Sequence, residues 1–80
     1  MSNIERVIAY YEKQGEKFID EYAVDIDLAL LRELWEAYAD DPMYYMVYPV
    51  GELQKEKLEE LLGEKLDFKR YAYYLECHSL

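Results

Sequence analysis

The chain has 80 residues, and its 18 Asp and Glu against 9 Lys and Arg give a formal net charge of -9 and a pI near 4.4. This balance excludes most nucleic-acid readers, because clustered cations that neutralise phosphates supply much of their affinity. The length allows one core, but not a multi-layer enzyme with a deep, water-excluding pocket. We therefore expect a single acidic domain over residues 1–80 with no enzymatic activity.

The composition also predicts a folded protein outside the membrane. Apolar residues make up 52% of the chain, counting ten tyrosines, so burial can offset the entropy lost on folding. No stretch approaches the roughly 18 apolar residues of a membrane span, and the first six residues lack the basic end and apolar run of a secretion signal. The single cysteine, Cys77, fits a reducing compartment. We expect a cytoplasmic location.

Residues 4–24 have the alternation of a β-hairpin. The first strand has apolar residues at Ile4, Ile8 and Tyr10, and the second has them at Phe18, Tyr22 and Val24. Gly15 lies between the two runs and can supply the positive φ of a turn. Val7, Ala9 and Tyr11 make the opposite face of the first strand apolar as well. That face indicates either a central strand or a second contact surface.

The apolar spacing then changes to that of a helix over residues 27–39. Its apolar side is formed by Leu28, Leu30, Leu31, Leu34, Trp35 and Tyr38. Asp27 is placed to cap the free backbone N–H groups at the helix start. We expect Pro42 to end the helix, because the residue before proline is pushed out of the α region.

The second half of the chain predicts one more helix and one more strand. Residues 43–48, between two prolines, form either an edge strand or an ordered loop. A helix begins near Gly51 and ends at Gly63, and its predicted buried stripe consists of Leu53, Leu58, Leu61 and Leu62. Residues 68–77 alternate with period two and predict a strand with one buried face.

The predicted order is ββα(β)αβ. Isolated elements of this kind would leave their apolar sides exposed, so both helices should pack on one face of a sheet. The fold class is therefore α+β: a two-layer sandwich with a three- or four-stranded, mainly antiparallel sheet.

The residues that could carry catalysis or bind metals lack the partners they would need. Cys77-His78 has no further Cys or His to complete a zinc site or a nucleophilic pair. We expect Cys77 to be a buried strand residue and His78 to belong to an exposed tail. Asp25 and Asp27 are not followed by the spaced oxygen ligands of a calcium loop. No metal, cofactor or catalytic residue is predicted.

Acidic and tyrosine side chains instead indicate a protein-binding surface. Glu59-Glu60 is typical of a solvated helix face. Asp40-Asp41 lies at the predicted end of the first helix, where the helix dipole disfavours anions, and is followed by Pro42-Met43-Tyr44. Ten tyrosines exceed what a core of this size can hold, so some should face outwards. Exposed tyrosine beside carboxylate is typical of surfaces that bind basic proteins.

Three segments carry a resemblance to a known group of proteins. They are Asp25-Ile26-Asp27-Leu28 leading to Leu31, Leu34 and Trp35; Asp40-Asp41-Pro42-Met43-Tyr44 with Tyr48-Pro49; and Tyr71-Ala72-Tyr73-Tyr74-Leu75-Glu76-Cys77. The chain resembles, from Ile4 onward, small acidic bacterial proteins similar to immunity proteins of polymorphic-toxin and contact-dependent growth-inhibition systems. It departs from them at Tyr45-Met46. The resemblance implies an inhibitor that is made beside a toxin and binds it in the cytoplasm.

We therefore predict an immunity-type inhibitor of a cognate bacterial toxin with a basic surface. A nuclease toxin presents a cationic cleft, so the carboxylates of an inhibitor can bind where the substrate phosphates would bind. The predicted contact surface is the polar face of the first helix and the segment after it, with Glu33, Glu36, Asp40, Asp41 and Tyr44.

Two other interpretations stay open. The chain could be an acidic nucleic-acid mimic or regulator that occupies a cellular basic protein, which requires carboxylates spaced along an extended surface. It could also be a homodimeric structural domain built through an exposed tyrosine strand. The free protein is expected to be a monomer or a homodimer that binds no nucleic acid and no membrane.

Overall fold

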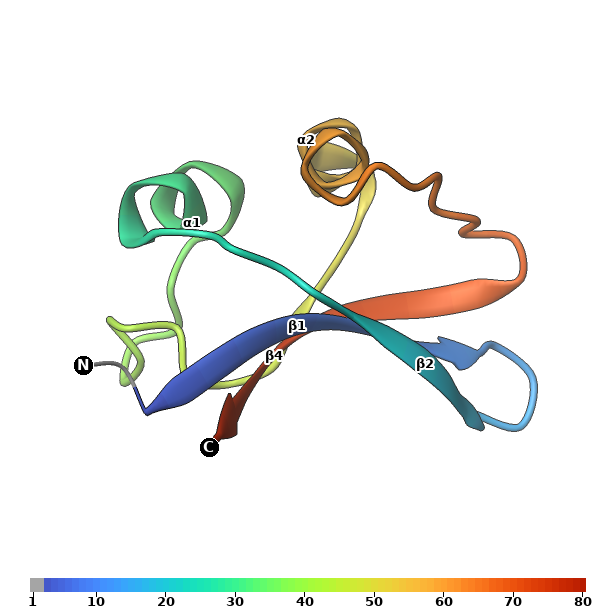
Figure 1. Cartoon of the computed structure of the whole chain (residues 1–80), viewed down its shortest axis with the longest axis horizontal. Helices are drawn as coiled ribbons and strands as arrows, with labels where there is room; N and C mark the ends of the chain where they lie inside the picture. Colours follow the sequence, from blue (N-terminus) through green and yellow to red (C-terminus); the bar gives the residue numbers. More distant parts are fainter. Residues whose placement is uncertain (1–2) are drawn as a thin grey trace.

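A computed structural model describes residues 3–80, and its elements follow the predicted order. They are β1 (Ile4–Glu12), β2 (Phe18–Ala23), α1 (Leu28–Leu34), β3 (Tyr48–Pro49), α2 (Glu52–Leu62) and β4 (Tyr71–Ser79). The strands lie in the order β2-β1-β4-β3, and every neighbouring pair is antiparallel. Both helices lie over the same face of the sheet (Figure 1). The predicted two-layer α+β sandwich is confirmed.

The predicted hairpin forms the centre and one edge of the sheet. Gly15 has a φ of 85° in the turn, in the region that glycine adopts without steric cost. Strand β1 pairs with β2 on one side and with β4 on the other, so Val7 lies opposite both Ala23 and Glu76. The pairing with β2 shifts between Tyr10 and Tyr11, which marks a bulge. The first strand is central, which is one of the two alternatives that its apolar faces predict.

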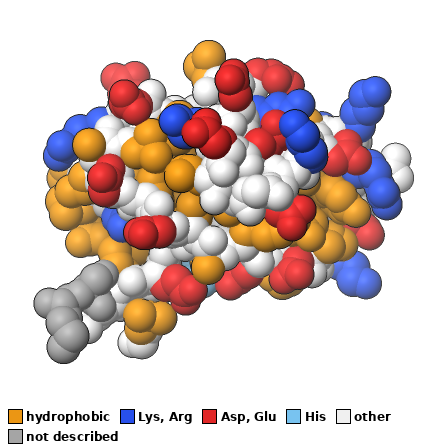
Figure 2. All heavy atoms as spheres, turned by 45° about the horizontal axis from the view of Figure 1, so that its top comes forward, with side chains coloured by type: hydrophobic (Ala, Val, Ile, Leu, Met, Phe, Trp, Pro, Cys, Tyr) orange, Lys and Arg blue, Asp and Glu red, His pale blue; other side chains and the backbone are white. Residues whose placement is uncertain are grey.

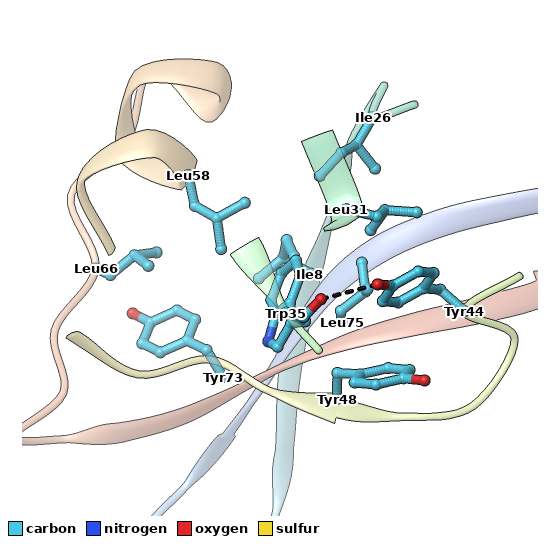
Figure 3. Packing of buried hydrophobic residues seen from close by; sticks show 10 residues of the cluster. All are labelled: Ile8, Ile26, Leu31, Trp35, Tyr44, Tyr48, Leu58, Leu66, Tyr73 and Leu75. Carbon is cyan, nitrogen blue, oxygen red and sulfur yellow. Dashed lines mark hydrogen bonds between the residues drawn. The ribbon is translucent and has the colours of Figure 1, made fainter. Parts of the chain in front are cut away.

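The core fills the space between the sheet and the helices. Ile8 of β1 and Leu75 of β4 point towards Leu31 of α1 and Leu58 of α2, and all four are fully buried (Figure 3). The same cluster also contains Ile26, Trp35, Tyr44, Tyr48, Leu66 and Tyr73. The tyrosines extend the core towards the β3 edge of the sheet.

Helix α1 begins as predicted but ends at Leu34 rather than at residue 39. Asp27 caps it, with its Oδ1 atom accepting from the Leu30 amide at 2.9 Å. Trp35 already has an extended backbone, and its indole Nε1 donates to the Pro49 carbonyl at 2.7 Å. The Trp35 carbonyl accepts from the Tyr44 hydroxyl at 2.8 Å (Figure 3). These tertiary bonds end the helix well before Pro42.

Helix α2 has both predicted ends but a different buried side. Gly51 caps its start, where its amide donates to Gln54 Oε1 at 2.8 Å, and Gly63 ends it with a φ of 68°. Leu58 is buried, whereas Leu53 is 90% exposed and Leu61 is also exposed. The predicted leucine stripe is therefore wrong at Leu53 and Leu61.

On the side of α2 that faces the core, the buried residue of the first turn is Gln54 and not the predicted Leu53. Its Nε2 atom donates to the carbonyl of Leu34, one of the free carbonyls at the end of α1. The contact line of α2 therefore runs through Gln54 and Leu58, which are four residues apart and share one helix face.

The last two strands differ in length from the prediction. Residues 43–47 form a loop, and only Tyr48–Pro49 pair as a short edge strand with β4. Strand β4 begins at Tyr71 rather than Phe68 and extends to Ser79. His78 is part of this strand, opposite Glu5, and does not belong to an exposed tail. Cys77 is half-buried rather than fully buried.

The burial within α2 gives a matched pair of variants. We expect Leu58→Ala to lower the free energy of unfolding by about 2 to 5 kcal/mol, because it leaves a cavity in the core. Leu53→Ala removes the same atoms from an exposed position and should change it by less than about 0.5 kcal/mol. Urea unfolding followed by circular dichroism measures both, and similar losses in the two variants would contradict this placement of α2.

Candidate functional site

The segment between α1 and β3 is a loop organised around the buried carboxylate of Asp41. Its Oδ1 atom accepts from the Tyr45 amide at 2.8 Å, and its Oδ2 atom accepts from the Met46 amide at 2.9 Å and the Tyr48 hydroxyl at 2.7 Å. The Tyr44 amide donates to the Asp41 carbonyl, and Tyr44 has a φ of 59°. A positive φ is uncommon for a residue other than glycine, so the surrounding bonds hold the turn in this shape.

Two further contacts attach the loop to the rest of the fold. The Tyr48 hydroxyl accepts from the Tyr38 amide at 3.1 Å, and the two rings stack with centroids 4.2 Å apart. On the other side, Nη2 of Arg6 in β1 donates to the Met43 carbonyl at 2.7 Å. We call residues 38–47 the tyrosine–methionine loop. Its ends and its middle are therefore fixed to the sheet.

Hydrogen bonds keep Asp41 ionised despite its burial. Burial by itself raises the pKa of this carboxyl, but the bonds from Tyr48, Met46 and Tyr45 and the nearby Arg6 cation bring the pKa below its ordinary value. The pKa of Tyr48 is raised, first by burial and then by its bond to Asp41. Both carboxylate oxygens are thus engaged within the loop.

The tyrosine–methionine loop exposes an unusual number of large apolar side chains. Half of the exposed large hydrophobic residues in the described part of the chain lie here: Tyr38, Met43, Tyr45, Met46 and Val47. Tyr45 and Met46 are 54% and 52% exposed. Apolar groups that stay in water while their backbone is held in one shape are typical of an interaction site.

The charged residues near this loop in the sequence are mostly acidic, although Arg6 of β1 contacts the loop. Between Phe18 and Gln54 the sequence contains nine Asp and Glu but one cation, Arg32. Four of the lysines lie instead in the β1–β2 turn and beyond α2, at Lys13, Lys17, Lys65 and Lys69. Figure 2 shows acidic side chains among exposed apolar ones, with many of the basic side chains gathered towards one end. The loop therefore lies in an acidic stretch of the sequence.

The structure separates the five residues of the predicted contact surface. Glu33 is exposed on α1, Glu36 on the segment between α1 and the loop, and Asp40 within the loop. Asp41 and Tyr44 are only 4% and 2% exposed, so their predicted place on the surface is wrong. Backbone amides capture the Asp41 carboxylate, and the Tyr44 hydroxyl donates to Trp35.

Sequence reasoning missed the apolar members of the site. Tyr38 was assigned to the buried side of the first helix, while Tyr45, Met46 and Val47 had no role. The available signal was a run of large apolar residues between Pro42 and Pro49 without the alternation of a buried strand.

Chemical sites are sparse in the described chain. Residues 3–80 contain no group of three or more His, Cys, Asp or Glu side chains that could hold a metal ion. The Nε2 atom of His78 lies 3.1 Å from Glu76 Oε1, in a half-exposed pair on β4. None of the helices in these residues has the length and apolar character needed to cross a membrane.

Fold and site together define a small acidic α+β domain with a rigid apolar loop. The chain belongs to the family described as a domain of unknown function (DUF7683), which matches residues 5–76. This span runs from β1 into β4 and so includes the tyrosine–methionine loop and both helices. Neither the curated proteins nor the solved structures contain a significant match.

Adjacent aspartates test the role of the buried carboxylate. We expect Asp41→Asn to lower the free energy of unfolding by about 2 to 4 kcal/mol, because an amide NH₂ would face donors that now bind a carboxylate oxygen. Asp40→Asn makes the same chemical change at an exposed position and should cost less than about 0.5 kcal/mol. Thermal and urea unfolding measure the difference, and equal stabilities of the two variants would refute the role of Asp41.

The lowered pKa of Asp41 also predicts a pH dependence of stability. The carboxyl has an ordinary pKa of 3.8 in the unfolded chain and a lower pKa when folded, so its contribution is present above 3.8 and is lost as pH falls through the folded pKa. We expect the stability gap between the wild type and Asp41→Asn to narrow below about pH 4. Urea midpoints at about pH 7, 5, 4 and 3 measure it, and a constant gap would contradict the assignment.

Proposed function

We propose that this chain is an immunity-type inhibitor that binds and neutralises a cognate bacterial toxin with a basic surface. The observation that carries the proposal is the tyrosine–methionine loop, which presents exposed apolar side chains beside Glu36 and Asp40. A partner with cations around an apolar depression complements this surface in both charge and hydrophobicity.

The two kinds of side chain have separate roles in such a complex. Glu33, Glu36 and Asp40 attract a basic partner over a distance and raise the association rate, an effect that salt screens. Tyr45 and Met46 then anchor the complex by burying apolar area. Because Asp41 already fixes the loop, little conformational entropy is lost when the anchors bind, which lowers the dissociation rate.

A nuclease is the toxin class that this surface fits best. A nuclease binds substrate phosphates with clustered Lys and Arg, and the carboxylates around the loop offer the same cations an alternative partner. The inhibitor would block the active site or the substrate groove without any catalytic group of its own.

The arrangement of charges favours a protein cleft over nucleic-acid mimicry. A mimic needs carboxylates spaced like phosphates along an extended surface, whereas Glu36 and Asp40 flank a compact apolar loop. A homodimer through the tyrosine strand is also less favoured, since β3 already pairs with Tyr74 and Leu75 at the middle of the outer edge of β4. Edge strand β2 could pair with a second copy only by bringing Asp20 and Glu21 of both chains together.

The first test is protection of cells. Co-expression of this chain should restore the growth of bacteria that express the neighbouring gene's product, and the two proteins should purify as a 1:1 complex. If growth is not restored and no complex forms, the proposal fails.

Charge reversals then test the surface itself. We expect Asp40→Lys to weaken toxin binding about 10- to 1000-fold, mainly by slowing association at low salt. The control is Glu56→Lys, which changes the net charge by the same amount at an exposed position of α2. We expect it to change the affinity for the toxin by less than about threefold. Surface plasmon resonance at two salt concentrations measures the rates. Equal effects of the two variants would remove the loop surface from the proposal.

A further inference from the structure

The face of the sheet that points away from the helices is not covered by any other element of residues 3–80 (Figure 1). We call it the open face: the side of Val7, Ala9 and Tyr11 in β1 and of the residues paired with them. A solvated sheet face normally carries polar residues at such positions. Here Val7 and Ala9 are 1% and 0% exposed. The open face is therefore apolar at its centre.

An aromatic row crosses the open face and borders a hollow. The ring of Tyr11 meets that of Phe18 edge-on at 5.5 Å and that of Tyr74 at 5.7 Å, so the row spans β2, β1 and β4. Ala72 lies directly opposite Tyr11, and its methyl group leaves the neighbouring space unfilled. The result is a hollow of about 470 Å³ whose lining includes Tyr11, Ala72, Tyr74 and Val47.

The charged groups of the open face are acidic. Its positions in β1, β2 and β4 include Glu5, Glu21 and Glu76 but neither lysine nor arginine. Glu12, Glu16 and Lys13 also line the hollow and add two acids and one cation. A second copy of this chain would bring the same carboxylates face to face, whereas a basic protein would complement them.

Glu76 places a carboxylate in the lining of this hollow. Its Oε2 atom accepts from the Tyr11 hydroxyl at 2.7 Å, and its Oε1 atom lies 3.1 Å from Nε2 of His78. The bond to Glu76 is the main cause that raises the pKa of Tyr11 to about 12. The phenol donates this bond and so holds the carboxylate in position.

We propose that the open face binds a basic segment of a protein partner and seats an arginine side chain in the hollow beside Tyr11, Tyr74 and Glu76. A guanidinium stacks on tyrosine rings and binds a carboxylate through its planar fork, and the hollow offers both partners. The apolar surroundings suit the aliphatic residues next to such an arginine. This second surface goes beyond the proposed function and rests on it only in that the partner is a protein.

Val47 joins the two surfaces. It is an exposed member of the tyrosine–methionine loop and also lines the hollow on the open face. One partner can therefore contact the loop and place an arginine under the sheet at the same time.

The test uses the full chain and two short peptides rather than a toxin. The probe is acetyl-Leu-Arg-Leu-amide, and the control has citrulline, an uncharged isostere, in place of arginine. In ¹⁵N NMR titrations we expect saturable shifts of the Ala72, Tyr74 and Glu76 amides with the arginine peptide, and about tenfold weaker binding of the citrulline peptide. Glu76→Gln should weaken the arginine peptide about tenfold, whereas Glu56→Gln on α2 should leave it unchanged.

Four results would overturn the proposal: equal binding of the two peptides, shifts confined to the tyrosine–methionine loop, no saturable shift, or no effect of Glu76→Gln. A doubled mass in sedimentation equilibrium, lost in Tyr74→Ser, would assign the face to a second copy and overturn it as well. Because no toxin is used, these results stand apart from the growth-protection test of the proposed function.

Discussion

The buried carboxylate of Asp41 is the interaction on which the shape of the tyrosine–methionine loop depends. Removing a charge from water is costly, and three hydrogen bonds within eight residues of chain offset that cost. In return, they define a loop that has almost no secondary structure of its own. The Tyr48 hydroxyl also accepts from the Tyr38 amide, which fixes the start of the loop. The Tyr44 hydroxyl donates to the Trp35 carbonyl and fixes the loop to the end of α1. Without this carboxylate, the loop would lose the three bonds that hold Tyr45, Met46 and Tyr48 around one point.

This internal constraint explains how the surface can be both apolar and well defined. Tyr45 and Met46 stay in water because Asp41 holds their amides and leaves their side chains outside. Asp40, in the same loop, is an exposed acid. The open face of the sheet also places apolar groups next to an acid, because the Tyr11 and Tyr74 rings lie beside Glu76. Both surfaces are therefore suited to basic proteins, although strands carry one and a loop carries the other.

Sequence reasoning succeeded where a single residue type specifies local geometry. Gly15 and Gly63 adopt positive φ, and Asp27 caps α1 because its side chain reaches the free amides of its own helix. It failed where distant groups compete for the same atoms. The Trp35 indole donates to the Pro49 carbonyl, and the helix ends before this residue. The buried Gln54 side chain donates to the Leu34 carbonyl at the end of α1. Asp41 and Tyr44 were read as surface residues because their partners cannot be inferred from periodicity or charge.

Hydrophobic periodicity and helix caps act within a few residues, so the local pattern of the chain specifies an acidic α+β domain with a hairpin, two helices and a final strand. Which acids and tyrosines face the solvent is set by the packing of distant segments. Exposure depends on which hydrogen-bond donors and apolar surfaces meet across the fold, and a residue such as Asp41 has the same local sequence whether it is bound inside or free outside. The site is therefore a property of the packing, while the fold class is already a property of the chain.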